Sequence, residues 1–221
     1  MTAQSAIRLM LAAALYLAGA LTVSSIPAAE LTREKALAAL SSASPQARRG
    51  AAERLGAVGK AGDSRVLADL LRDPDGETRA AAEAALWKVW GRSGDTRIDA
   101  LYERGVSEMN AGAAPAALAT FNEIVRRKPD FAEGWNKRAT VLYFMGRYKE
   151  SLADCDQVMK RNPLHFGALS GYGQIYLQLD EQDQALAYFE KALAINPGME
   201  GVALNVAALR RLRAERARKA I

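Results

Sequence analysis

The residues of this chain best suited to chemistry are one histidine, one cysteine and two aspartates. His165 follows the segment 162–164 (NPL) in a predicted turn, where a lone histidine is expected to be a solvated or turn residue. No second ligand lies at the spacing that a metal site needs. Cys155 falls at a predicted core position with no histidine near it, so we expect a small buried hydrophobe and no nucleophile. Asp154 and Asp156 should project to different sides of their helix, which makes them poor partners for acid–base catalysis.

Motifs that carry chemistry in other proteins are absent from the sequence. It contains no glycine-rich phosphate loop and no GxSxG, HExxH or CxxC motif. The sequence therefore predicts a protein that is not an enzyme, with no catalytic residues, no metal and no cofactor.

The charge is concentrated at one end. The chain carries a formal net charge of +5, and its last residues combine six basic side chains with a single acid, Glu215. The six are Arg210, Arg211, Arg213, Arg216, Arg218 and Lys219. Because the remaining charges nearly cancel, we expect no nucleic-acid surface. The tail is either a solvated helix or a weak contact for an anionic lipid or polymer surface.

The segment 1–29 has the pattern of an export signal. Arg8 precedes an apolar stretch, Leu9–Val23, and small residues around Pro27 follow it. That run is shorter than the about 20 apolar residues that a membrane-spanning helix needs. The segment 1–29 is therefore predicted to be a cleaved signal peptide and the protein to be exported, to a bacterial periplasm. The alternative is an uncleaved inner-membrane anchor formed by residues 9–29.

A 34-residue repeat dominates the second half of the chain. Pro129, Pro163 and Pro197 follow one another at this interval. The same spacing links five further sets, which are Leu101, Trp135 and Leu169; Gly105, Ala139 and Gly173; Gly112, Gly146 and Asp180; Ala117, Ser151 and Ala185; and Phe121, Cys155 and Phe189. Small residues let helices approach, the Gly or Asp suits the turn after a first helix, and proline closes the second. Each unit is thus a predicted helical hairpin that must stack on its neighbours.

This pattern resembles the tetratricopeptide repeat (TPR) family, in three copies over residues 98–199. The third copy, LSGYGQIYLQLDEQDQALAYFEKALAINP, is the most similar to the family pattern. The first copy has Glu108 where an aromatic residue is usual, and the second has Ser151 and Cys155 in place of Ala and Phe. The resemblance implies an all-α solenoid of stacked helical hairpins that forms a right-handed superhelix.

A fainter repeat precedes this array. Residues 44–73 resemble residues 75–105, and both look like short HEAT-type repeats, so residues 30–94 are predicted to be HEAT-like and residues 95–199 to hold the three TPR units. One helix that starts near residue 95 is expected to serve both arrays in a continuous superhelix, with Trp87 and Trp90 packed at the junction or stacked on a ligand. Residues 200–221 are predicted to form a capping helix, with Val202, Val206, Leu209 and Leu212 as its apolar stripe.

The TPR resemblance also implies a ligand site, because the first helix of each repeat lines the concave groove. The groove residues that it points to are Tyr102, Met109, Asn136, Thr140, Tyr143, Phe144 and Gln174. Tyr143 and Phe144 are the expected anchors, although Phe144 could instead pack on the next helix. Some co-chaperone repeats grip a peptide carboxylate with Lys and Asn, but Tyr102 and Val106 stand at those positions here, so that function is not expected.

The predicted function is therefore a non-catalytic adaptor or scaffold that binds a protein or peptide partner in the groove. The alternative is a structural accessory subunit anchored in the membrane. The sequence leaves the partner and the oligomeric state open.

Overall fold

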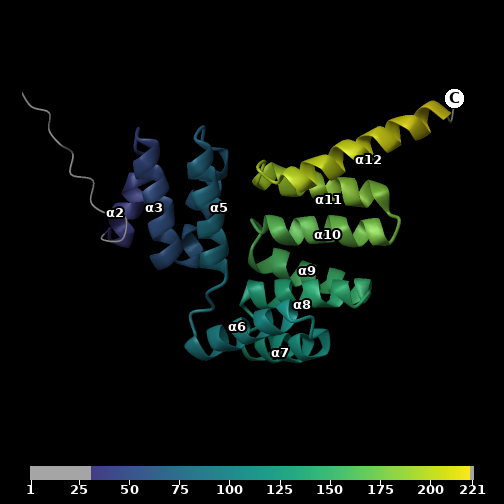
Figure 1. Cartoon of the computed structure of the whole chain (residues 1–221), viewed down its shortest axis with the longest axis horizontal. Helices are drawn as coiled ribbons and strands as arrows, with labels where there is room; N and C mark the ends of the chain where they lie inside the picture. The colour runs from purple at the N-terminus through teal and green to yellow at the C-terminus, as the bar shows by residue number, and fades with distance from the viewer. Residues whose placement is uncertain (1–30, 220–221) are drawn as a thin grey trace, which may run out of the picture.

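The computed structural model describes residues 31–219, and every regular element in that range is a helix (Figure 1). The elements are α2 (Arg33–Ala39), α3 (Pro45–Val58), η2 (Ala61–Asp63), α4 (Ser64–Asp69), η3 (Leu70–Arg72), α5 (Gly76–Trp90), α6 (Thr96–Asn110), α7 (Ala114–Arg127), α8 (Ala132–Phe144), α9 (Tyr148–Arg161), α10 (Phe166–Gln178), α11 (Gln182–Ile195) and α12 (Glu200–Lys219). The predicted all-α solenoid of stacked hairpins is confirmed. The predicted signal or anchor in the segment 1–29 lies outside the described residues.

Three helical hairpins form the body of the molecule. Helices α6 and α7, α8 and α9, and α10 and α11 pair closely, and each hairpin packs on the next (Figure 1). The turn within each hairpin has one residue in the left-handed conformation: Gly112 and Gly146 at φ +72° and Asp180 at φ +59°. This conformation ends the first helix and reverses the chain. Three of the residues that define the 34-residue repeat thus have the same structural role.

Complementary side-chain sizes hold each hairpin together. Gly105 lies against the ring of Phe121, and Gly173 lies against the ring of Phe189, so a β-carbon at either glycine would collide with the ring. In the middle hairpin the ring is replaced by Cys155 and the small residue opposite is Ala139, and the two share one core cluster. The departure of the second repeat from the family pattern is therefore compensated within its own hairpin.

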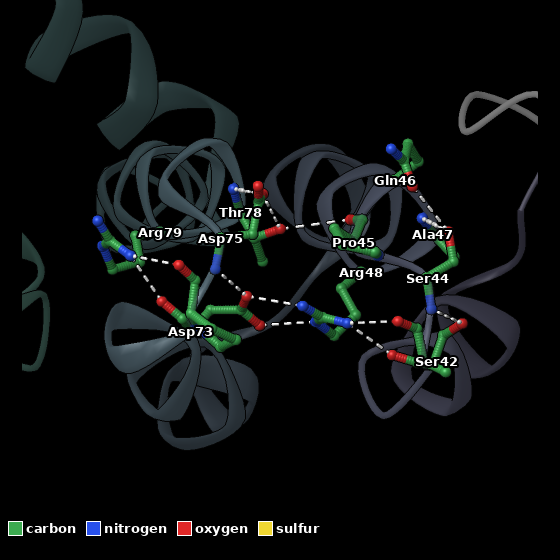
Figure 2. Close-up of polar contacts among 12 residues, drawn as sticks. Ser42, Ser44, Pro45, Gln46, Ala47, Arg48, Asp73, Asp75, Thr78 and Arg79 are labelled. Atoms are coloured by element: carbon green, nitrogen blue, oxygen red, sulfur yellow. Dashed lines mark hydrogen bonds and ion pairs between the residues drawn. The ribbon is translucent and has the colours of Figure 1, made fainter.

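The N-terminal helices repeat one set of contacts with a 31-residue period (Figure 2). Arg48 donates to the backbone carbonyls of residues 42 and 43, and Arg79 donates to those of residues 73 and 74. The side chains of Ser44 and Asp75 accept hydrogen bonds from the third backbone N–H of α3 and α5. Both helices therefore begin with the same cap and the same arginine-held loop.

A paired carboxylate joins the two copies of this motif. Asp73 accepts two hydrogen bonds from Arg48, at 2.6 and 2.7 Å, and the guanidinium holds the pKa of this carboxyl below its usual value (Figure 2). The equivalent loop position, Ser42, has no charge. The ion pair thus links the loop before α5 to helix α3.

The junction between the two halves differs from the prediction. Helix α6 packs on α7 and α8, while α5 packs on α3 and α4 and lies beside the turns that precede α10 and α12 (Figure 1). The expectation that one helix serves both arrays is therefore wrong. The physical reason is that the face of α5 turned away from α3 carries Trp87 and Trp90, which need a broad apolar partner.

These turns supply the partner surface. Trp90 stacks on the ring of His165 with 4.7 Å between centroids, and Trp87 meets Phe166 edge-on at 5.1 Å. Polar contacts flank the aromatic cluster: Asn196 donates to Glu83 at 3.0 Å, and Arg72 donates to the carbonyls of residues 194 and 195. Of the two roles expected for the tryptophans, this structure shows junction packing.

Helix α12 covers the last hairpin with its first half. Val202, Val206 and Leu209 are buried against α11, as predicted. Leu212, the fourth member of the predicted stripe, is 43% exposed. Beyond it the helix extends away from the body (Figure 1). Within residues 31–219, no helix has the length and apolar character of a membrane span.

Candidate peptide-binding groove

An open hollow of about 260 Å³ lies between the first helices of the second and third repeats, α8 and α10. Five of the seven predicted groove residues line it, namely Asn136, Thr140, Tyr143, Phe144 and Gln174. The other lining residues are Ala139, Ser151, Cys155, Gly167, Ser170, Gly171 and Ile175. The periodicity of the α-helix explains this grouping, because it places side chains one turn apart on the same face of each helix.

The two remaining predicted residues lie elsewhere. Tyr102 packs edge-on against Phe121 and Phe131, and its hydroxyl donates to Glu133 at 3.3 Å. Burial raises the pKa of this hydroxyl above its usual value. Met109 is partly buried in the core of the first hairpin. The structure therefore does not bring Tyr102 and Met109 to the hollow.

The hollow exists because α10 has few side chains on its inner face. Gly167, Ser170 and Gly171 lie on that face, where the second repeat has Glu133, Asn136 and Lys137 at the equivalent positions of the 34-residue period. The floor includes the small residues Ala139, Ser151 and Cys155. Ser151 donates to the carbonyl of Ala139 at 2.7 Å, so this buried hydroxyl is satisfied.

The lining is electrically neutral: among the described residues, none that lines the hollow has a charged side chain. Cys155 is 2% exposed, and burial, together with the neighbouring aspartates, raises its pKa to about 12. Its thiol therefore stays protonated, which confirms the prediction of a buried hydrophobe. Asp154 and Asp156 bind different partners, Arg138 on α8 and Tyr172 on α10, and so point to different sides as predicted.

Some polar side chains around the hollow already form hydrogen bonds within the protein, and others do not. The amide nitrogen of Asn136 donates to both oxygens of Glu133, at 3.1 and 3.2 Å, and Thr140 donates to the carbonyl of Asn136 at 3.0 Å. Within residues 31–219, the side chains of Gln174 and Ser170 have no hydrogen-bond partner. These two side chains, more than Asn136, are available to a ligand.

Aromatic side chains form one rim. Phe144 is 74% exposed, so it does not pack on the next helix. Tyr143 lies beside it, with ring centroids 5.5 Å apart, and Gln178 donates to the Tyr143 hydroxyl at 3.4 Å. A large exposed aromatic side chain beside an apolar hollow is typical of a binding surface.

A buried hydrogen bond between His165 and Glu133, behind the hollow, was not predicted from the sequence. Of the two predicted states of His165, the turn residue is the one observed and the solvated residue is not, because its side chain is fully buried and forms the N-cap of α10. Its Nδ1 accepts from the backbone N–H of Ala168 at 3.0 Å, so Nε2 carries a hydrogen and donates to Glu133 at 2.8 Å. Only the place of His165 directly before a helix hinted at this role.

Glu133 is also buried, with 2% exposure, and is surrounded by polar partners. Its oxygens contact His165, Asn136, Tyr102 and Lys137, with the Lys137 nitrogen at 3.2 Å. Burial raises the pKa of this carboxyl, but the hydrogen bond from His165 and the nearby positive charges outweigh it and lower the pKa to about 2. The carboxylate is therefore ionised and holds the N-terminal end of α8 to that of α10.

Comparison with known proteins identifies the hairpins. Residues 136–200 match the family model described as tetratricopeptide repeat. A TPR repeat-containing protein of Rhizobium etli is 37% identical over 126 residues, which are 57% of this chain and 61% of that protein. The chain thus spans less than two thirds of the length of this relative.

Solved structures agree on the fold. The first TPR of Spaghetti (RPAP3), bound to the HSP90 peptide SRMEEVD, aligns with a TM-score of 0.52 at 17% identity over 54% of this chain and 94% of that one. The Sgt2 TPR domain of Aspergillus fumigatus aligns with a TM-score of 0.53 at 18% identity, over 57% of this chain and 85% of that one. At such identities the likeness concerns the fold.

Helices α6 to α11 form a solenoid of three paired-helix units that have the tetratricopeptide repeat fold. Within the chain, residues 136–200 carry the tetratricopeptide repeat sequence pattern. The family model does not extend over residues 31–95, so the HEAT-like character of that part stays a prediction.

Proposed function

We propose that this protein is a non-catalytic adaptor whose hollow between α8 and α10 binds an extended segment of a partner protein. The observation that carries the proposal is a neutral hollow with an exposed aromatic rim, at Phe144, and a free amide, at Gln174. Clefts with an apolar lining and a few convergent polar groups are typical ligand sites. A structural relative of the repeat array is bound to a peptide, which supports the same use of this fold here.

The peptide of that relative has an acidic end, SRMEEVD, but the features of this chain favour a different ligand. Tyr102 and Val106 belong to the core of the first hairpin, and no cation lines the hollow among the described residues. A carboxylate would lose its hydration there without a counter-charge. The proposed partner segment is therefore not an acidic C-terminus.

A pull-down with the full chain tests the proposal. Phe144→Ala with Gln174→Ala should remove the specific partner, and Leu204→Ala, on the exposed face of α12, should retain it. Equal recovery of every partner by the wild type and both variants would refute the groove. Gln174 is a better target than Asn136, because removing Asn136 would also disturb the buried Glu133.

We also propose that the protein is exported, on the basis of the apolar run Leu9–Val23 and the small residues after it. The alternative proposal is a structural accessory subunit anchored by residues 9–29. The two differ in the mass of the protein isolated from cells. Loss of the segment 1–29, or of one close to it in length, supports the exported adaptor, and an intact chain in the membrane fraction supports the anchored subunit.

A weak contact between the end of α12 and an anionic surface is a separate proposal. Arg211, Arg213, Arg216 and Arg218 are exposed, and among the described basic residues of this helix only Arg210 forms an ion pair, with Glu190 at 2.7 Å. Replacing the four exposed arginines by Gln should abolish retention on phosphatidylglycerol vesicles at low salt. Retention that these substitutions leave unchanged ends the idea.

A further inference from the structure

Gly171 has no packing reason to be glycine. A β-carbon there would meet only the sulfur of Cys155, at 3.8 Å, which is ordinary contact. The neighbouring glycines differ: a β-carbon at Gly173 would collide with Phe189, and one at Gly167 with Trp87. The φ angle of Gly171 is not positive either. A helix with glycine at an interior position is less stable than one with alanine there. Gly171 therefore lowers the stability of α10, and it leaves the hollow open.

The shape and chemistry of the hollow define what fits. Its volume of about 260 Å³ exceeds the cavity of about 150 Å³ that holds a benzene ring in another protein. The floor is formed by Ala139, Cys155 and Ile175, all nearly fully buried. The polar groups without partners, Gln174 and Ser170, can bind the backbone of a ligand beside the apolar floor.

Charge excludes most alternatives. The lining has no ionised side chain, and the buried carboxylate of Glu133, which contacts Asn136, is already bound by His165, Asn136 and Lys137. A charged side chain in the hollow would lose its hydration without a partner. An aromatic or long aliphatic side chain would gain burial against the floor and against the exposed ring of Phe144.

The geometry points to a specificity pocket: the space left by Gly171 receives one uncharged aromatic or large aliphatic side chain of the partner segment. This inference rests on the proposed function and names the side-chain class that the groove selects. Gly171 determines specificity by leaving room, and Gln174 positions the backbone of the segment beside the anchor.

The test uses single-residue probes on the full chain. N-acetyl-phenylalanine amide, titrated in NMR experiments, should shift the signals of Gly171, Ser170 and Gln174 in a saturable way, with a dissociation constant on the order of 1 mM expected for so small a ligand. N-acetyl-aspartate amide should leave them unchanged. Equal effects of the two probes would overturn the inference.

A filled pocket provides the matched comparison. Gly171→Leu should weaken binding of the phenylalanine probe at least tenfold, while Gly201→Leu on α12, where a β-carbon meets nothing within 4 Å, should leave it unchanged. Unchanged circular dichroism in both variants checks the fold. Undiminished binding to Gly171→Leu would refute the pocket.

The same variants separate this inference from the proposed function. A partner lost with Phe144→Ala and Gln174→Ala but retained by Gly171→Leu would leave the groove in place and remove the pocket. If the phenylalanine probe binds but no partner protein is recovered, the pocket is supported and the proposed adaptor function is not. Self-association of the chain that Gly171→Leu abolishes would make a second copy the occupant, and would overturn the assignment to a partner protein.

Discussion

Two glycines close together in α10 illustrate how much depends on what faces a single residue. Gly173 lies against the ring of Phe189, whereas the space at Gly171 is open. Gly173→Ala should therefore destabilise the protein by about 1–3 kcal/mol through overpacking. Gly171→Ala should stabilise it by about 0.5–1 kcal/mol through helix propensity. Urea unfolding of both variants measures the difference, and equal effects would mean that the two sites have the same environment.

The buried Glu133 predicts a dependence of stability on pH. Its pKa is lowered from 4.5 to about 2 in the folded protein, so its contribution is complete above about pH 5 and is lost as the pH falls toward 2. Glu133→Gln should flatten the pH dependence in that window. It should also cost about 1–3 kcal/mol at neutral pH, because a buried donor would lack a partner.

A surface carboxylate is the control for this experiment. Glu123 forms an ion pair with Arg127 one helical turn away, at 2.8 Å, and such pairs contribute about 0.3–0.5 kcal/mol. Glu123→Gln should leave the pH profile close to that of the wild type. A wild-type profile that is flat between pH 5 and pH 2 would contradict the ionised state of Glu133.

Cys155 and His165 differ in how far their burial can be predicted from the sequence. The burial of Cys155 could be predicted, because the 34-residue period places it in register with Phe121 and Phe189. The burial of His165 could not, because it depends on Trp87 and Trp90, which lie on α5 in the other half of the chain and belong to no shared period. The 34-residue period predicts contacts within and between repeats. It does not predict that α5, which lies outside the period, packs on the turns of the repeat array.

At the scale of elements, α12 is held to the array by one half only. Leu209 is 6% exposed against α11, while Leu204 on the same helix is 72% exposed. Leu209→Ala should lower the free energy of unfolding by about 2–4 kcal/mol, and Leu204→Ala should change it by less than about 0.5 kcal/mol. Thermal unfolding followed by circular dichroism compares them. Similar losses in both variants would mean that α12 does not act as the cap.

Five of the seven predicted groove residues lie around one hollow, whereas Tyr102 and Met109 do not. Asn136, Thr140, Tyr143, Phe144 and Gln174 meet at one hollow because the spacing within α8 and α10 determines which faces they share. The depth of that hollow comes from the missing side chain on α10 at Gly171. The repeat pattern predicts which side chains face the groove, and it does not predict a hollow where a side chain is absent.

At the scale of the whole molecule, the packing of the N-terminal helices α2 to α5 against the repeat array could not be predicted from the sequence. The 31-residue and 34-residue periods each define a local unit, and the side chains of Ser44, Asp75 and Asp95 cap the helices that follow them. Neither period specifies where α5 packs after the chain leaves it. That choice depends on the match between two indole rings and the turns around His165 and Asn196.

This docking should make the two halves unfold together. Trp87 contacts Phe166 and His165 across the junction, and a large apolar contact between units couples their stabilities. The wild type is therefore expected to lose its far-UV circular dichroism in one transition as urea is raised. Trp87→Ala should give two transitions, because the N-terminal helices lose their support on the repeat array before the array itself unfolds.

Trp135 serves as the matched control for that experiment, because its indole packs against Arg138 and Arg161 within the repeat array and is not among the aromatic contacts of the junction. Trp135→Ala should lower the urea midpoint and keep a single transition. Two transitions in the wild type would mean that the halves are only weakly joined. A single, merely shifted transition in Trp87→Ala would mean that Trp90 and the polar contacts of Asn196 and Arg72 hold the junction without it.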